Sequence, residues 1–379
     1  MIQTKRFGDE LKNLNFNQYI GVPCSFLKSL INYAMNECEY IAATNEGDAV
    51  AIASGVSVGG EKPVVLMQNS GLTNAVSPLT SLVYPFQIPI LGFVSLRGEE
   101  GIRDEPQHEL MGQITMKMLD LMEVEWQYLS TEIEKALEQI KVANNHIEDK
   151  RSFFFIVKKG TFSDEKLIKE TLSTNVNQNI VEKKWTNQLP TRFEALKVIN
   201  EMKDSHTIQL ATTGKTGREL YEIEDADNNL YMVGSMGCIS SFGLGLAISQ
   251  LNQNIVVIDG DGSLLMRLGS MATIGYYQPS NMLHILLDNH TYDSTGGQST
   301  VSQNIDFNNI AASCGYANSL FIHNLSELQA AIIHWKKEKS LTFLHLKISK
   351  GSKQKLGRPT IKPFEVHERL KRFINEGSE

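Results

Sequence analysis

Short apolar runs alternate with segments of helical periodicity along almost the whole chain. Such runs are typical of strands in a parallel sheet that helices cover on both faces, because these strands are buried on both sides. The sequence therefore predicts an α/β fold with doubly wound parallel sheets. The predicted strands cover residues 40–43, 64–68, 90–94 and 153–157 in the first half, and 207–210, 231–233, 255–259, 283–288 and 343–348 in the second.

The chain has 379 residues, which exceeds the size at which a single core usually keeps growing and favours two domains. A polar stretch at 161–190, with scattered charge and a terminal Pro, is typical of a linker. We predict domains at 1–165 and 191–379, joined by a linker at 166–190. The similar halves suggest a duplicated architecture, although they show no residue-level repeat.

The net charge of −7 argues against a nucleic acid as partner, because such binding relies on an excess of Lys and Arg. The four cysteines have no spacing that indicates a zinc site or a disulfide framework. The N-terminal residues lack the apolar segment of an export signal, and no apolar run reaches the roughly 18 residues that span a bilayer. We expect a cytoplasmic protein that binds neither nucleic acid nor membrane and acts on a small anionic molecule.

The strongest chemical signal lies where a predicted strand runs into Gly260, Asp261, Gly262 and Ser263 before a helical pattern. Glycines in such a turn let the backbone approach an anion, and the helix N-terminus offers unpaired N–H groups. Asp261 is a hard oxygen ligand that suits Mg²⁺ beside a phosphate. Another predicted strand is followed by Asn289 at the same edge of the sheet. Each feature alone is also typical of ordinary turns, but their joint spacing favours a binding site.

The string GDGS, followed at this distance by DN, resembles the motif of thiamin-diphosphate enzymes, which begins with GDG and ends with NN. The resemblance implies thiamin diphosphate and Mg²⁺ as cofactors. It also implies Asp261, Asn289 and the backbone carbonyl of Thr291 as metal ligands. Asp288 replaces the first Asn of the family motif. Because the family's ligand is the second Asn, which is kept here, the metal assignment stands.

Two further turns in the second half resemble cofactor contacts of the same family. In a Gly-rich turn, the resemblance implies cofactor contacts from Gly234, Ser235 and Met236: the Gly234 carbonyl binds the 4′-amino group, and Met236 supports the bent cofactor. In a strand-to-helix turn it implies diphosphate contacts from Thr213 and Gly214. The glycines of these turns also favour close helix packing.

In the first half, Glu46 stands at the start of a predicted helix rich in Ala and Gly. An acidic residue at a helix N-terminus complements the helix dipole and is common on surfaces. In thiamin-diphosphate enzymes a glutamate at this place protonates N1′ of the aminopyrimidine, so that the cofactor becomes its own base. The resemblance assigns this role to Glu46, and it places Asn69, Ser70 and Gly71 along the cofactor cleft.

The resemblance also implies a pyrimidine-binding first domain and a diphosphate-binding second domain, without the central third domain of the usual thiamin decarboxylase. In enzymes of this architecture the two domains meet over one cofactor between subunits. We therefore expect at least a homodimer with shared active sites.

Several strings, among them DEPQH and YDSTGGQ, resemble those of phosphonopyruvate decarboxylases over nearly the whole chain. The resemblance implies a lyase of phosphonate biosynthesis that releases CO₂ from phosphonopyruvate. Arg suits bidentate recognition of a phosphonate, so Arg97, Arg103 and Arg358 are the candidate substrate ligands, although each alone could be a solvated surface charge. Asp104 and His108 are candidate catalytic residues that supply a proton or order the substrate.

Three alternatives stay open at this point. Sulfopyruvate decarboxylases act on a sulfonate of similar size, but they are often split between two chains, so a fused chain favours phosphonopyruvate. A carboligase of the acetolactate synthase type is disfavoured by the short chain. A noncatalytic thiamin-binding subunit would leave Glu46 idle beside Asp261 and Asn289.

Overall fold

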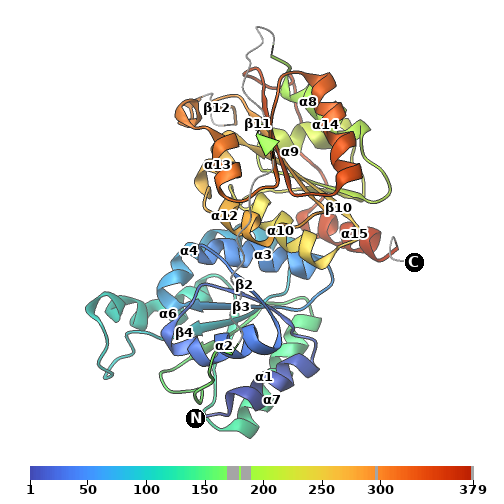
Figure 1. The fold of residues 1–379 in the computed structure, drawn as a ribbon. Coiled ribbons are helices and arrows are strands. Elements are labelled where there is room, and N and C mark those ends of the chain that lie inside the picture. Colours follow the sequence, from blue (N-terminus) through green and yellow to red (C-terminus); the bar gives the residue numbers. More distant parts are fainter. Residues whose placement is uncertain (169–178, 181–188, 295–297, 377–379) are drawn as a thin grey trace. The chain divides into compact units, whose positions relative to one another are not determined.

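The computed structural model describes residues 1–168, 179–180, 189–294 and 298–376. The chain divides into two compact units, Met1–Leu172 and Ser173–Glu379, and each is built on a parallel sheet (Figure 1). Most of the predicted linker lies outside the described residues, so the predicted domain boundaries stay a prediction. The described residues form no third compact unit. Within this part of the chain, the structure contains no helix with the length and apolar character that crossing a membrane requires.

The first unit contains a six-stranded sheet in the order β2-β1-β3-β4-β6-β5, in which every neighbouring pair is parallel. β3, β4 and β6 are almost entirely buried, which explains their continuous apolar sequences. The strands are β1 (Gln18–Gly21), β2 (Glu39–Ala42), β3 (Pro63–Gln68), β4 (Leu91–Ser95), β5 (Glu125–Tyr128) and β6 (Phe153–Val157).

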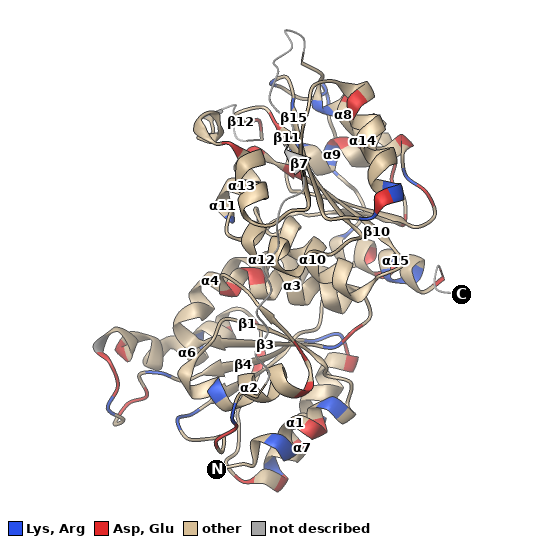
Figure 2. Cartoon of the chain, viewed as in Figure 1, with Lys and Arg blue, Asp and Glu red and all other residues tan. Residues whose placement is uncertain are grey.

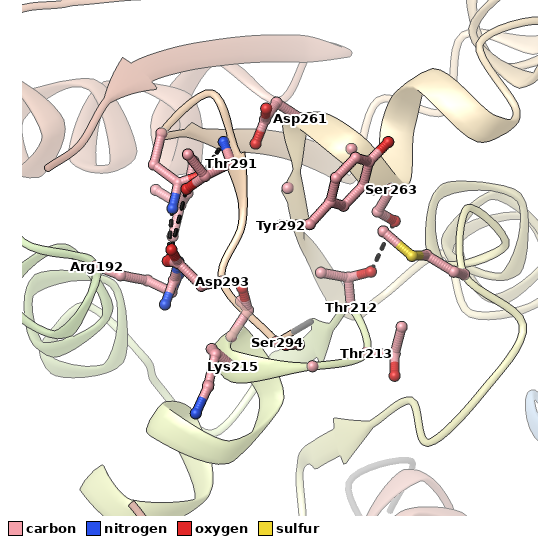
Figure 3. A pocket seen from close by; sticks show the side chains of 17 residues that line it. Arg192, Thr212, Thr213, Lys215, Asp261, Ser263, Thr291, Tyr292, Asp293 and Ser294 are labelled. Atoms are coloured by element: carbon pink, nitrogen blue, oxygen red, sulfur yellow. Dashed lines mark hydrogen bonds and ion pairs between the residues drawn. The ribbon is translucent and has the colours of Figure 1, made fainter. Parts of the chain in front are cut away.

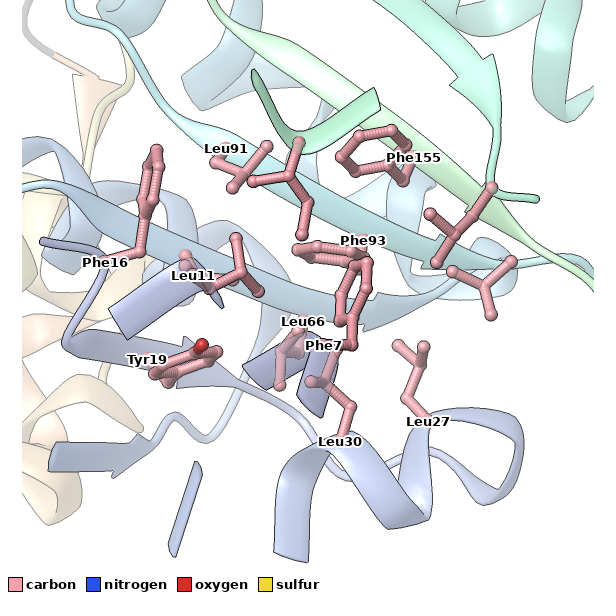
Figure 4. Packing of buried hydrophobic residues seen from close by; sticks show 14 of the residues in the cluster. Phe7, Leu11, Phe16, Tyr19, Leu27, Leu30, Leu66, Leu91, Phe93 and Phe155 are labelled. Atoms are coloured by element: carbon pink, nitrogen blue, oxygen red, sulfur yellow. The ribbon is translucent and has the colours of Figure 1, made fainter. Parts of the chain in front are cut away.

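Helices cover both faces of this sheet (Figure 1). On one face α1 (Thr4–Asn13), α2 (Lys28–Glu37) and α7 (Ile133–Glu148) bury an aromatic and aliphatic core that includes Phe93 and Phe155 (Figure 4). On the other face α3 packs against β1 and β3. The remaining helices are α3 (Glu46–Val58), α4 (Leu72–Pro78), α5 (Tyr84–Phe86) and α6 (Glu109–Leu121), with the π-helix η3 (Leu79–Val83) and the short 3-10 turns η1 (Ser25–Leu27), η2 (Asn69–Gly71) and η4 (Pro106–His108).

The second unit contains a seven-stranded sheet in the order β7-β14-β15-β11-β10-β8-β9, again with parallel pairs throughout. A separate two-stranded antiparallel sheet joins β12 to β13. The strands are β7 (Asn179–Ile180), β8 (Thr207–Ala211), β9 (Asn229–Tyr231), β10 (Asn254–Gly260), β11 (Met282–Asp288), β12 (Thr291–Tyr292), β13 (Gln298–Ser299), β14 (Asn318–Ile322) and β15 (Thr342–Lys347).

The helices of the second unit include α10, which carries no charged residue, whereas Figure 2 shows charges gathered on the outer helices and loops. α10 is buried from Ile239 to Ala247 and packs on β10. The helices are α8 (Arg192–Glu201), α9 (Lys215–Ile223), α10 (Ile239–Ser249), α11 (Asp261–Met266), α12 (Ser270–Tyr277), α13 (Phe307–Ser313), α14 (Leu325–Glu338) and α15 (Pro363–Glu376), with the short turn η5 (Ser302–Asn304).

The two sheets have the same topology, which confirms the predicted duplicated, doubly wound architecture. Leaving β7 aside, both sheets run second-first-third-fourth-sixth-fifth when their strands are numbered along the chain. The strand order therefore reverses between β1 and β3 in the first unit, and between β8 and β10 in the second. Ligands of open α/β sheets bind at the carboxyl ends of the strands beside such a switch point. Each unit thus presents one preferred binding place.

All nine predicted strands are present, with shifted ends in most of them. The largest shift concerns the predicted strand 231–233, because β9 covers Asn229–Tyr231. The sequence analysis missed β1, β5 and β14 in the main sheets, as well as the two-residue strands. β5 and β14 lie at or next to a sheet edge and are only partly buried, so their sequences lack a continuous apolar run.

Candidate active site

A cavity of about 240 Å³ lies at the switch point of the second unit (Figure 3). Three segments that each follow a strand form most of its wall, and Met236 and Arg192 complete it. The segments supply Thr212 to Thr216 after β8, Gly260 to Ser263 after β10, and Leu287, Asn289 and Thr291 to Ser294 at and after the end of β11. Nine of the predicted site residues line this cavity: Thr213, Gly214, Met236, Gly260, Asp261, Gly262, Ser263, Asn289 and Thr291.

The junction where β10 runs directly into α11 is packed so closely that it needs glycine at position 262. A Cβ on Gly262 would lie 2.2 Å from the ring of Tyr292. Ser263 ties this turn to two others, since its hydroxyl is 2.8 Å from that of Thr212 and accepts the N–H of Gly237 at 3.2 Å. These contacts hold the three turns around the cavity in fixed places.

The turn between β8 and α9 offers an anion site. Gly214 has φ of +92°, a conformation that favours glycine, and directly precedes the nine-residue helix α9. The first N–H groups of a helix lack partners within the helix and carry the positive end of its dipole. Lys215 also lines the cavity. A diphosphate therefore fits this wall of the cavity.

The predicted metal ligands are hard oxygen donors, which suit Mg²⁺. Asp261 is 2% exposed, and its Oδ2 accepts hydrogen bonds from the hydroxyls of Thr300 at 2.5 Å and Ser302 at 3.0 Å. Burial raises the pKa of the Asp261 carboxyl, so the ionised form needs a nearby cation. Asn289 and Thr291 line the same cavity. The donor set therefore fits a magnesium ion.

A second group that could hold a metal comprises Asp261, Asp288 and His290. Here, however, an ammonium already provides the positive charge. Lys347 Nζ lies 2.5 Å from Asp288 Oδ2 and 2.6 Å from His290 Nε2, and His345 Nε2 lies 3.0 Å from the same carboxylate oxygen. Asp288 does not line the cavity. Asp288, which replaces the first Asn of the family motif, thus forms a buried ion pair with Lys347 behind the cavity wall.

The Gly-rich turn before α10 places one of its three predicted contact residues at the cavity. Met236 lines it, whereas Gly234 and Ser235 are not among the lining residues. Ser235 and Gly237 both have positive φ, at +50° and +92°, so the chain turns sharply around Met236.

In the first unit Glu46 and Gly71 lie together, with Glu46 at the first position of α3. Asn74 Nδ2 donates to Glu46 Oε2 at 2.9 Å. A Cβ on Gly71 would lie 2.1 Å from Glu46 Oε1. The missing side chain of Gly71 is therefore what leaves room for the carboxylate.

Asn69 and Ser70 follow β3 at the switch point of the first unit. Asn69 is fully buried, and its Nδ2 donates to the carbonyl of Arg97 at 2.8 Å and to Thr115 Oγ1 at 3.1 Å. Ser70 accepts a hydrogen bond from Gln68 Nε2 at 2.6 Å. Asn69 thus fixes the start of the loop that carries Arg97 and Arg103.

Arg97 is bound by its own loop. Its guanidinium donates to both carboxylate oxygens of Asp104, with Nε at 2.7 Å from Oδ2, and its Cζ lies 4.7 Å from the ring centre of Phe26. The Arg97 guanidinium holds the pKa of the Asp104 carboxyl well below its usual range. Asp104 therefore stays ionised at neutral pH, which disfavours it as a proton donor.

The other predicted residues of this group differ in their surroundings. His108 is 8% exposed, and its Nδ1 has no hydrogen-bond partner among the described residues. Arg103 is exposed in the same loop, and Arg358 is exposed in the second unit. The structure therefore separates the three predicted arginines into one paired and two exposed residues.

Sequence reasoning missed several residues of the cavity wall. Tyr292, Asp293 and Ser294 lie within the string YDSTGGQ and directly after Thr291, so their position was a usable signal. Arg192 stands at the start of α8, about 100 residues before Asp293 in sequence, and no motif marks it.

Comparisons with known proteins agree with this geometry. The N-terminal TPP binding domain of thiamine pyrophosphate enzymes matches residues 4–119, and the C-terminal TPP binding domain matches residues 213–346. The solved structure of benzoylformate decarboxylase from Polynucleobacter necessarius has a TM-score of 0.75 at 14% identity and covers 93% of this chain and 100% of that chain. It therefore shares the fold.

Full-length relatives are more specific. Phosphonopyruvate decarboxylase of Streptomyces viridochromogenes is 39% identical over 372 residues, which cover 96% of this chain and 93% of the relative. That of Streptomyces hygroscopicus is 37% identical, with 97% and 92% covered. Sulfopyruvate decarboxylase of Methanosarcina acetivorans is 29% identical over 376 residues, with 96% and 94% covered.

The last relative corrects one argument from the sequence. A single sulfopyruvate decarboxylase chain aligns with both halves of this protein, so a fused chain does not discriminate between the two substrates. The higher sequence identity to the two Streptomyces enzymes places the chain with the phosphonopyruvate decarboxylases rather than with the sulfopyruvate decarboxylase. The chain therefore belongs to the phosphonopyruvate decarboxylase family of thiamine pyrophosphate enzymes.

Proposed function

We propose that this protein catalyses the thiamin-diphosphate- and Mg²⁺-dependent, non-oxidative decarboxylation of 3-phosphonopyruvate to phosphonoacetaldehyde and CO₂. The observation that carries the proposal is the cavity at the second switch point, where the start of α9 and the oxygen donors Asp261 and Asn289 line one space. The phosphonopyruvate decarboxylases at 37–39% identity support the substrate.

The residues of the second unit bind and orient the cofactor. Asp261, Asn289 and the Thr291 carbonyl hold Mg²⁺, and the turns at Gly214 and Gly260 bring backbone N–H groups to the diphosphate. When bound, the cofactor supplies the electron sink for the loss of CO₂. Met236, at the cavity wall, would support the bound cofactor.

In the first unit, Glu46 and His108 hold and donate protons. Glu46 holds the proton at N1′ of the aminopyrimidine, with Asn74 fixing one carboxylate oxygen and Gly71 leaving space for the other. Because Asp104 stays ionised beside Arg97, His108 is the better donor of the proton that the product needs. Asp104 then has a different role, which is to order the loop and the Arg97 side chain.

We also propose a cytoplasmic homo-oligomer, at least a dimer, that serves phosphonate biosynthesis. The predicted cofactor residues lie at equivalent switch points of two different units. A site that needs both sets of residues draws on both kinds of unit, and we propose that the two units come from different chains.

A second candidate activity is the decarboxylation of sulfopyruvate, which the Methanosarcina relative favours through its coverage of both halves. The test is to measure CO₂ release from phosphonopyruvate, sulfopyruvate and pyruvate in parallel with purified protein, Mg²⁺ and cofactor. We expect the highest kcat/KM for phosphonopyruvate. A higher value for sulfopyruvate would establish the alternative, and no release from any of the three would refute a decarboxylase of this class.

A further inference from the structure

Asp293 lies beside Arg192 and Thr291 at the wall of the cavity (Figure 3). Its carboxylate accepts hydrogen bonds from four donors. Its Oδ2 accepts from Asn289 Nδ2 at 2.7 Å and from an Arg192 N–H at 2.5 Å. Its Oδ1 accepts from the Thr291 hydroxyl at 3.0 Å and from the Gly351 N–H at 3.4 Å. The Asp293 and Arg192 side chains are only 10% and 7% exposed. This is a built network rather than a surface ion pair.

The network determines which way the amide of Asn289 faces. Its Nδ2 donates to Asp293, and its Oδ1 accepts the N–H of Thr291 at 3.0 Å. If the amide were turned over, its oxygen would face a carboxylate and its NH₂ group would face an N–H. Both contacts would be repulsive. An amide oxygen has two lone pairs, so Oδ1 keeps one for a cation, whereas an NH₂ group cannot bind one.

We propose that Asp293 is the positioning residue of the metal site, and that it holds the Asn289 amide with its oxygen toward Mg²⁺; this rests on the metal site of the proposed function. Loss of a residue that orients a metal ligand from behind commonly weakens metal binding substantially.

Arg192 completes the arrangement from a distant part of the chain. It extends from the start of α8 to Asp293 and lies 3.7 Å from Glu219 Oε1. A buried carboxylate without a cation would be costly, so Arg192 keeps Asp293 charged and in place. Its guanidinium is thereby used inside the protein and is not free to bind the substrate's anionic group.

The test is calorimetric titration of the full-length apoprotein with Mg²⁺ at saturating thiamin diphosphate. Asp293→Ala should raise the Kd for Mg²⁺ about 10- to 100-fold, as loss of an orienting partner typically does. Asp293→Asn keeps one acceptor but loses the charge, so we expect a smaller rise, roughly 3- to 10-fold.

Asp225→Ala is the matched control, because Asp225 pairs with Arg369 at the same 2.5 Å in the same unit but does not line the cavity. It should leave the Mg²⁺ affinity unchanged. Asp261→Ala tests the underlying site and should abolish binding. Wild-type affinity in Asp293→Ala, or in Asp293→Asn if the alanine variant does not fold, overturns the positioning role. Wild-type affinity in Asp261→Ala instead overturns the metal site of the proposed function.

Discussion

At the scale of single residues, Gly71 matters because it has no side chain. Its φ of −76° is open to any residue, so an alanine is tolerated by the backbone but meets the Glu46 carboxylate. We predict that Gly71→Ala lowers kcat toward the level of Glu46→Gln, about 10²- to 10⁴-fold below wild type, with little change in stability. Hydrogen–deuterium exchange at C2 of the bound cofactor measures the affected step.

Gly357→Ala is the control for this substitution, since a Cβ there meets nothing within 4 Å. It should keep full activity. If Gly71→Ala also keeps the wild-type exchange rate, Glu46 does not act through the position seen here.

The pair of Arg97 and Asp104 predicts a pH-dependent stability. The pKa of Asp104 is lowered in the folded protein, so its stabilising effect is complete above the unfolded value of about 3.9 and is lost as the pH falls below it. Asp104→Asn should therefore be less stable than wild type at pH 7, and the difference should shrink below about pH 4. Urea unfolding of both proteins between pH 3 and 7 measures this, and an equal gap at both ends would contradict it.

The substrate's phosphonate needs a cation, and pairing with Asp104 makes Arg97 the weakest of the three candidates. We propose Arg103 or Arg358, which are both exposed. Replacing the true ligand by Ala should lower kcat/KM for phosphonopyruvate about 30- to 150-fold, because a charge-assisted contact contributes roughly 2 to 3 kcal/mol. Turnover of pyruvate, which lacks the phosphonate, should hardly change. Equal losses on both substrates would exclude a role in binding the phosphonate.

At the scale of elements, the packing of α10 on β10 determines where two cofactor turns lie, the Gly-rich turn before α10 and the turn at the end of β10. A Cβ on Gly243 would lie 2.4 Å from Val257 Cγ2, a branched methyl that has little freedom to move. The overpacking in Gly243→Ala should therefore destabilise the protein by about 1 to 3 kcal/mol. The better helix propensity of alanine offsets about 1 kcal/mol of this loss.

Thermal unfolding measures this loss. The double variant with Val257→Ala supplies the control, because removing the opposing methyl groups should make the two effects less than additive. Strict additivity would show that the two residues do not press on each other.

At the scale of the whole molecule, the same topology occurs twice, and each copy contributes a different part of the proposed chemistry. If one active site takes Glu46 from one chain and Asp261 from another, two inactive variants can complement each other. Random mixing of Glu46→Gln and Asp261→Ala chains should make half of the dimers heterodimers. Each heterodimer has one intact site of two, so the mixture should show about a quarter of wild-type activity. Activity that stays at the level of the separate variants would place both residues of each site on one chain.

The sequence determined the fold class, the duplication and most of the cavity wall. These features depend on local patterns: buried parallel strands are continuously apolar, and phosphate-binding turns need glycines next to a strand and a helix. The partly exposed strands β5 and β14 were not predicted, because their burial depends on neighbouring segments that the sequence does not identify.

Only the tertiary structure decided how the site residues are paired. Arg97 with Asp104 and Asp288 with Lys347 are ion pairs, and the first pair changes the roles expected of Arg97 and Asp104. Arg192 meets Asp293 across about 100 residues of sequence. A charged side chain looks the same in a sequence whether it faces solvent or a buried partner, because the partner comes from another strand or helix. Folding brings the two together, and that determines which charges remain free for chemistry.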